Sequence, residues 1–287
     1  MKIGISMFVT DRTASPGEVA AAVEARGIES YWVSEHSHIP LREPHPFTGF
    51  DVRTYAAMLD PFVALTAAAG ATKTIRLGTA VCLIAQRDPI DCAKSVASVD
   101  LLSGGRVELG IGAGWNIAEM EDHGTRAEGR FKLMRERVEA MQALWTQDPA
   151  AYNGDLVQIS DAHIWPKPVQ SPHPPVLIAG SGPNILKRVA RYGDGWLPVV
   201  PPEANEEMRG RVTPMPEFVE MVPRLAEMAA EAGRSTPKIS VMGAAPTPDN
   251  LETFNRLGVE RMILGLTPSD LDSVNRELDR YASLTGN

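Results

Sequence analysis

Eight short apolar segments alternate along this chain with stretches of helical periodicity, and this alternation limits the fold more than any other feature. The segments are rich in Val, Ile and Leu, as expected of parallel strands that are buried on both faces. Repeated strand and helix units predict an α/β protein with a parallel sheet. The predicted strands are Ile3–Val9, Ser30–Ser34, Ile75–Leu83, Arg106–Ile111, Pro175–Ala179, Gly195–Val199, Lys238–Met242 and Arg261–Leu266.

The segments between these strands carry apolar side chains at spacings of three and four residues, which is typical of helices with one buried face. Glycines that follow helical segments are suited to end them. Three helices show the pattern most clearly. Their apolar positions are Phe131, Met134, Val138, Met141 and Trp145; Phe218, Val222, Leu225, Ala229 and Ala232 before Gly233; and Leu271, Val274, Leu278 and Tyr281, while Gly27, Gly104 and Gly258 follow other helical segments.

Eight such units in 287 residues, without a Pro/Gly/Ser-rich linker, favour one (β/α)8 TIM barrel over residues 1–287. A doubly wound open sheet is the alternative. The chain is 44% hydrophobic, which is enough for a large core. In a barrel, functional residues are expected where the strands end and the following loops begin.

Composition excludes several function classes. The net charge is −8 and no run of Lys or Arg occurs, which argues against a general nucleic-acid binder. No signal peptide and no apolar stretch of membrane-spanning length is present, so a soluble cytoplasmic protein is expected. The two cysteines, Cys82 and Cys92, lack the spacing of a metal or redox motif and are expected to be buried apolar residues.

Two predicted loops are long. The loop at residues 37–60 follows the second strand, lies on the expected functional face and is long enough to cover a ligand. The loop at residues 148–174 precedes the fifth strand, and its Pro-rich end predicts an extended insertion with a packing role.

Histidines follow the second strand in the segment Ser34–His38. His36 at a strand end is suited to exchange protons near neutral pH, and the alternative is a structural histidine bonded to a neighbour. His38 and His45 lie further into the loop, where histidines are commonly solvated.

Small residues end three further strands. Gly78–Cys82 and Gly110–Trp115 would let a flat ligand approach the backbone, although ordinary core packing is the alternative. The second of these is not a dinucleotide-binding fingerprint, because its third glycine is absent. The glycine-rich turn Gly180–Pro183 precedes a predicted helix, and it therefore favours binding of a phosphate group.

Together these segments resemble the bacterial luciferase-like flavin and deazaflavin oxidoreductases, over nearly the whole chain. Within that family the chain looks most similar to the branch that uses the deazaflavin coenzyme F-420. The motifs that carry the resemblance are Trp32–His36, Leu77–Val81, Leu102–Arg106 with Gly110–Trp115, and Ala179–Pro183 with Gly193–Trp196.

The resemblance implies a coenzyme ring in the mouth of the barrel, with His36 at its reactive edge and Glu35 adjacent. It implies a bulge at Ala80–Val81, often with a non-proline cis peptide, behind the ring. The coenzyme phosphate would contact Gly180, Ser181 and Gly182. The implied coenzyme-binding residues are His36, Thr79, Ala80, Val81, Cys82, Ala113, Gly114, Trp115, Gly180, Ser181, Gly182 and Pro183.

One position departs from the sugar-phosphate dehydrogenases of that branch. They have an acidic catalytic residue at the position of Trp115 and an Asn three residues later, where this chain has Ala118. This difference disfavours such a dehydrogenase.

We therefore expect hydride transfer between the deazaflavin and a small carbonyl, alcohol or activated alkene, with His36 and Glu35 as catalytic residues. The alternatives are a monooxygenase that uses reduced FMN from a separate reductase, and a flavin-binding protein without turnover. The resemblance also implies a homodimer. Several cations could offset the acidic net charge near an anionic coenzyme, although surface positions are the alternative for each: Arg87, Lys167, Lys187, Arg188, Arg209 and Arg211.

Overall fold

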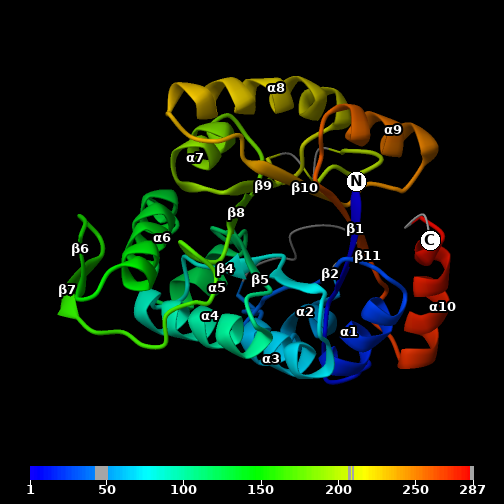
Figure 1. The fold of residues 1–287 in the computed structure, drawn as a ribbon, viewed down its shortest axis with the longest axis horizontal. Helices are drawn as coiled ribbons and strands as arrows, with labels where there is room; N and C mark the ends of the chain where they lie inside the picture. Colours follow the sequence, from blue (N-terminus) through cyan, green and yellow to red (C-terminus); the bar gives the residue numbers. More distant parts are fainter. Residues whose placement is uncertain (43–50, 206–207, 209, 285–287) are drawn as a thin grey trace.

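The structure, a computed structural model, describes residues 1–42, 51–205, 208 and 210–284. Within these ranges nine strands form one parallel sheet that closes on itself (Figure 1). Around the sheet the order is β3, β2, β1, β11, β10, β9, β8, β5 and β4, and a β3–β5 pairing closes the barrel. This closure excludes the doubly wound sheet. The strands are β1 (Lys2–Met7), β2 (Ser30–Val33), β3 (Arg76–Thr79), β4 (Cys82–Leu83), β5 (Val107–Gly112), β8 (Val176–Ala179), β9 (Gly195–Leu197), β10 (Lys238–Met242) and β11 (Arg261–Gly265).

All eight predicted strands are present, and the third is divided into β3 and β4. β3 pairs with β2 and β5, and β4 pairs with β5 through Cys82 and Ile111. The peptide bond between Ala80 and Val81 is cis and lies between the two segments. The bulge expected at this place is therefore observed.

Helices surround the barrel (Figure 1). Several begin at side-chain caps followed by proline, as at Ser15 and Asp88, whose side chains accept hydrogen bonds from the first-turn amides. Gly27, Gly104, Gly233 and Gly258 all have positive φ and follow helices, as predicted. The helices are α1 (Pro16–Ala25), α2 (Val52–Ala56), α3 (Pro61–Ala71), α4 (Pro89–Ser103), α5 (Ile117–Asp122), α6 (Arg130–Thr146), α7 (Ile185–Tyr192), α8 (Met215–Glu231), α9 (Pro248–Arg256) and α10 (Leu271–Ala282).

The apolar face predicted for α6 is buried except at its start. Met134, Val138, Met141 and Trp145 are buried against the barrel. Phe131 is 39% exposed, so its assignment to the buried face was wrong. Phe131 lies in the first turn of α6, at the rim of the barrel. Its ring stacks there against two arginine side chains.

The two long loops differ in their relation to the barrel. The loop at residues 37–60 contains α2, and Met58 forms an isolated antiparallel bridge with Thr10; His45 lies outside the described residues. The loop at residues 148–174 forms a hairpin of β6 (Ala150–Asn153) and β7 (Gln158–Ala162) beside α6 (Figure 1). Its Tyr152 hydroxyl donates to Glu139 of α6, which supports the packing role expected for it.

A buried arginine links strands at the amino-terminal end of the barrel. Arg261 at the start of β11 is 2% exposed and donates to both carboxylate oxygens of Glu29, at 2.6 and 2.8 Å. It also donates to both oxygens of Glu108 in β5, at 2.9 and 3.1 Å. Arg76 of β3 donates to Glu108 as well. This network lies at the end of the barrel where residues contribute to stability rather than catalysis.

Replacing Gly78 with alanine is expected to destabilise the barrel by about 1–3 kcal/mol, because overpacking forces neighbouring groups to move. A Cβ atom at this position would lie 2.2 Å from Cε3 of Trp32, a fully buried side chain. Urea unfolding of the variant measures the loss. Gly265→Ala is the matched control on another strand, since its Cβ would meet nothing within 4 Å. Equal stability of the two variants would contradict the prediction.

None of the described helices has the length and apolar character needed to cross a membrane. Cys82 and Cys92 are both buried, as expected from the sequence.

Candidate functional site

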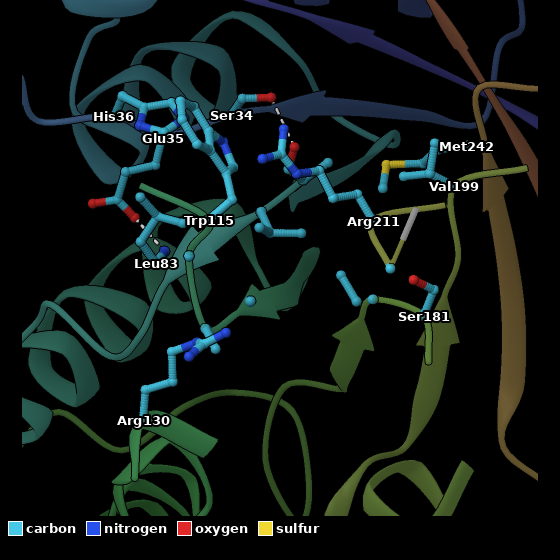
Figure 2. A pocket seen from close by; sticks show the side chains of 18 of the residues that line it. Ser34, Glu35, His36, Leu83, Trp115, Arg130, Ser181, Val199, Arg211 and Met242 are labelled. Carbon is cyan, nitrogen blue, oxygen red and sulfur yellow. Dashed lines mark hydrogen bonds between the residues drawn. The ribbon is translucent and has the colours of Figure 1, made fainter. Parts of the chain in front are cut away.

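A cavity of about 540 Å³ opens at the carboxyl ends of the barrel strands (Figure 2). This is the face at which TIM barrels place their functional residues, and the volume is within the range of small-molecule sites. Side chains from nearly every strand end contribute to it. The wall residues that follow or end strands are Phe8, Ser34, Glu35, His36, Ala80, Val81, Leu83, Gly112, Ala113, Gly114, Trp115, Ala179, Gly180, Ser181, Val199 and Met242.

His36 lies in the cavity wall and is paired with a buried carboxylate. Its Nδ1 lies 2.7 Å from Oε2 of Glu119, and the two side chains are 5% and 0% exposed. The imidazole also packs against two aromatic rings, with centroid distances of 5.4 Å to Tyr55 and 5.2 Å to Trp115. These contacts hold the ring in one orientation.

Glu119 was not among the residues predicted from the sequence. It occupies the first turn of α5, where the Asn116 side chain accepts a hydrogen bond from its amide. Its Oε1 accepts hydrogen bonds from the Ser37 amide at 2.8 Å and hydroxyl at 3.2 Å. The sequence signal was Asn followed three residues later by Glu, which indicates a helix start and nothing about His36.

The electrostatics of this pair favour a charged carboxylate. Burial raises the pKa of Glu119, but the hydrogen bond and positive charge of His36 and the two hydrogen bonds from Ser37 outweigh it, so the pKa lies below its usual value. An ionised carboxylate accepts a proton-bearing Nδ1 from His36. Nε2 is then the ring nitrogen that can exchange a proton with a ligand.

A stability measurement tests this balance. The folded-state pKa of Glu119 is depressed, so its ionisation stabilises the fold at pH values above 4.5, the ordinary pKa of a glutamate. This contribution is lost as the pH falls through the folded-state pKa. Glu119→Gln should therefore be less stable than the parent at pH 7, with a difference that narrows below about pH 4.5. Denaturant unfolding at several pH values measures it. Glu121→Gln, on the exposed side of α5, is the control. A pH-independent difference would contradict the prediction.

Glu35 has a different environment from the one that the sequence suggested. Its carboxylate accepts a hydrogen bond from the Leu83 amide at 2.7 Å (Figure 2). It also accepts one from Nε of Arg87 at 2.7 Å. Arg87 also donates to Asp60. Although Glu35 borders the cavity, its oxygens are bound by these structural partners. The carboxylate that contacts His36 is Glu119, whereas the contacts of Glu35 anchor Leu83 and Arg87. A catalytic role of Glu35 stays a prediction.

The bulge residues divide into two groups. Ala80 and Val81 line the cavity. Thr79 and Cys82, which were also predicted to contact the coenzyme, do not line the cavity. Their side chains are 1% and 0% exposed and lie within the barrel wall. The Thr79 hydroxyl donates to the Gly110 carbonyl at 2.7 Å. The bulge between β3 and β4 interrupts the alternation of side chains, so the consecutive residues Ala80 and Val81 both line the cavity while Thr79 and Cys82 do not.

The glycine-rich turn after β8 is divided in the same way. Gly180 and Ser181 line the main cavity. Gly182 and Pro183 instead line a neighbouring cavity of about 220 Å³ that is closed on one side by α8. The main cavity therefore includes only the first half of the predicted phosphate-binding turn. Ala113, Gly114 and Trp115 all line the main cavity as predicted.

The cavity also contains residues that the sequence did not indicate. Tyr55 and Met58 reach it from the loop at residues 37–60. Of the six candidate cations, Arg188 and Arg211 line it, whereas Arg87 binds Glu35 and Lys167 donates to backbone carbonyls. Lys187 lines the neighbouring cavity, and Arg209 lies outside the described residues. Further lining residues are Arg130, Phe131 and Gly210.

His38 belongs to a polar cluster outside the cavity. Its Nε2 lies 3.0 Å from Asp122, and its Nδ1 lies 2.8 Å from the Ser37 hydroxyl. The same hydroxyl lies 2.7 Å from Nε2 of His123. These contacts fasten the start of the long loop to α5, which also carries Glu119.

Comparisons with known proteins agree with this architecture. The family model described as luciferase-like monooxygenase matches residues 9–247. An uncharacterized protein of Mycobacterium tuberculosis is 38% identical over 290 residues, covering 99% of this chain and 98% of the relative. The F420-dependent glucose-6-phosphate dehydrogenase of Amycolatopsis mediterranei is 33% identical over 184 residues, covering 63% of this chain and 51% of that enzyme. The crystal structure of monooxygenase RslO1 from Streptomyces bottropensis shares the fold, with a TM-score of 0.76 and 19% identity over 99% of this chain and 98% of that one.

Proposed function

We propose that this chain, which belongs to the luciferase-like monooxygenase family, is a coenzyme F-420-dependent oxidoreductase that transfers a hydride between the deazaflavin and a small carbonyl, alcohol or activated alkene. The observation that carries the proposal is the buried His36–Glu119 pair in the wall of a cavity at the strand ends. The dehydrogenase relative named above supports the choice of coenzyme.

Several features of the cavity support binding of a planar coenzyme with an anionic side chain. Ala80 and Val81 present small apolar side chains that would support one face of a ring, and Val199 and Met242 lie across the cavity from Trp115 (Figure 2). The Ser181 hydroxyl is buried and has no hydrogen-bond partner among the described residues. An unpaired buried hydroxyl favours binding of an oxygen-rich group such as a phosphate. Ala80, Val81, Gly180 and Ser181 would therefore hold the coenzyme.

When bound, the deazaflavin supplies the hydride chemistry, so the chain must orient the reactants and manage the proton. His36 would exchange the accompanying proton through Nε2, while Glu119 keeps the proton on Nδ1. Tyr55 and Met58 would cover the reactants and exclude water from that side.

Trp115 supports a substrate other than a sugar phosphate. Its ring forms an aromatic wall with His36 and Tyr55, and the Tyr55 and Trp115 centroids are 6.3 Å apart. Such a wall packs well against an apolar or planar substrate. This side of the cavity lacks the acidic residue implied for the sugar-phosphate dehydrogenases at position 115.

A monooxygenase that uses reduced FMN is the second candidate, since the family description names that activity and a monooxygenase shares the fold. This version requires a separate reductase as partner.

Titration of the purified protein with each oxidised coenzyme separates the two candidates. We expect micromolar binding of coenzyme F-420, measured by its fluorescence, and negligible binding of FMN. Reduced coenzyme should then be oxidised by a member of a carbonyl and alkene panel, and not by oxygen alone. Tight FMN binding with oxygen consumption would replace the first proposal with the second.

A further inference from the structure

Two arginines share one aromatic ring at the edge of the cavity. Arg130 is the first residue of α6 and Arg188 lies on α7, the helix that follows the Gly180–Ser181 turn. Their guanidinium carbons lie 4.7 and 3.7 Å from the centroid of Phe131. Both arginines are half-buried and line the main cavity. Figure 2 shows Arg130 extending from α6 toward the space below Trp115.

Neither arginine forms an ion pair with a carboxylate of the described residues. Arg130 donates one bond to the Ala127 carbonyl at 2.9 Å, and its Nε is buried without a partner. Arg76, Arg87 and Arg261, which are also partly or fully buried, each bind at least one carboxylate. The chain has 36 acidic and 28 basic side chains, so acidic partners are abundant. Arg106 is buried without a carboxylate too, but its guanidinium donates to four backbone carbonyls and the Thr72 hydroxyl, whereas a single hydrogen bond is recorded for the Arg130 guanidinium among the described residues.

Holding two guanidinium groups together costs free energy through mutual repulsion. Burial lowers the pKa of Arg188, and the charge of Arg130 lowers it further against an opposing effect of Tyr192. Both side chains remain charged, because arginine is not deprotonated in proteins. Stacking on Phe131 fixes the position of both groups but leaves their charge unneutralised. Such an arrangement is stabilised when an anion binds between or beside the two groups.

We propose that Arg130 and Arg188 form an anion clamp for the acidic side chain of the bound coenzyme. This inference rests on the proposed function. The chemistry recognised is that of a phosphodiester or carboxylate oxygen. The clamp and the unpaired Ser181 hydroxyl line the same cavity, and α7 connects them, so the side chain would run from Ser181 along α7 toward Phe131. The clamp also resolves how a chain of net charge −8 attracts an anionic ligand.

The test compares two ligands that share one chromophore. Coenzyme F-420 carries the phosphate and acidic tail, and its ribityl precursor carries neither. We expect the double variant Arg130→Met/Arg188→Met to bind coenzyme F-420 about 10- to 100-fold more weakly, as expected for the loss of charge-assisted hydrogen bonds, while affinity for the precursor changes less than about threefold. Fluorescence titration at low salt measures both.

Two further variants keep the test valid. Arg191→Met removes an exposed arginine from the same helix and should leave both affinities unchanged. Arg188→Lys keeps a charge and should give an intermediate affinity for coenzyme F-420, which serves if the double variant does not fold.

Three results would overturn the clamp assignment. The first is an equal loss of affinity for both ligands, because the arginines would then shape the cavity and not bind an anion. The second is no loss for either ligand. The third is an unchanged coenzyme affinity with a raised KM for an anionic substrate, which would assign the pair to the substrate.

If the parent protein binds neither chromophore, the proposed function fails and the clamp is tested separately. Pyrophosphate or citrate at millimolar concentration should then raise the Tm of the parent but not of the double variant. An identical response of the two proteins would overturn the clamp as well.

Discussion

Replacing His36 with alanine is expected to lower turnover about 100- to 10,000-fold while coenzyme affinity changes only a few-fold. The imidazole of His36 lines the cavity and can carry a proton. Its Nδ1 lies 2.7 Å from Oε2 of the buried Glu119 carboxylate, which holds the ring in place. In the proposed function its loss would remove the proton exchange that accompanies hydride transfer, whereas Ala80, Val81 and Ser181, which also line the cavity, would remain to bind the coenzyme. Steady-state kinetics and fluorescence titration of the same preparation separate kcat from binding.

Two companion variants show whether the effect belongs to the pair. Glu119→Gln keeps the size of the side chain but removes its charge, and it should lower kcat less than His36→Ala does. His38→Ala removes a half-buried histidine of the neighbouring polar cluster and should leave kcat within about threefold of the parent. Unchanged turnover in His36→Ala would exclude His36 from the mechanism.

Replacing Arg261 with methionine is expected to lower the free energy of unfolding by about 3–5 kcal/mol, because it removes the partner of Glu29 and leaves the buried Glu108 carboxylate with Arg76 alone. Arg261 binds Glu29 and Glu108 through both oxygens of each carboxylate and packs over the Trp32 ring at 5.1 Å. These contacts join β11 and β5 across the amino-terminal end of the barrel. Urea unfolding followed by circular dichroism measures the loss.

The pH dependence of this loss has a defined sign. Burial raises the pKa of Glu108, but Arg261 and Arg76 outweigh it and hold the pKa below the ordinary 4.5. The charged Glu108 carboxylate therefore stabilises the parent at pH values above 4.5. The difference in free energy of unfolding between the parent and Arg261→Met should shrink as the pH falls below about 4.5. Lys238→Met, whose parent side chain is 69% exposed, should cost less than about 0.5 kcal/mol. A loss from Arg261→Met no larger than that of this control would show that the network does not stabilise the barrel.

The architecture was predictable because periodicity is a local property of the sequence. Each strand had to be buried on both faces, one against the helices and the other in the barrel interior, and this requirement appears directly as short apolar runs such as Arg106–Ile111 and Lys238–Met242. The location of the cavity followed from the barrel itself, since strand ends converge on one face. His36, Ala80, Val81 and Trp115 line the cavity for this reason.

Residues that act through distant partners were not predictable in the same way. Glu119 contacts His36 across 83 positions of sequence, and its own neighbourhood indicates only the start of a helix. Glu35 is adjacent to His36 in sequence, yet its carboxylate binds Leu83 and Arg87. Sequence proximity therefore did not indicate which carboxylate contacts His36, because side-chain direction depends on which neighbours the closed barrel supplies.

The sequence by itself determined the order and type of the secondary structures, the closed barrel as the favoured fold and the face that carries the cavity. Those features depend on short-range periodicity, on turn chemistry and on the handedness of strand and helix units. Only the tertiary structure decided that Glu119 pairs with His36, that Thr79 and Cys82 are turned into the barrel wall, and that Arg130 and Arg188 meet on Phe131. These pairings join elements distant in the chain, and their geometry exists only once the sheet has closed and the helices have packed around it.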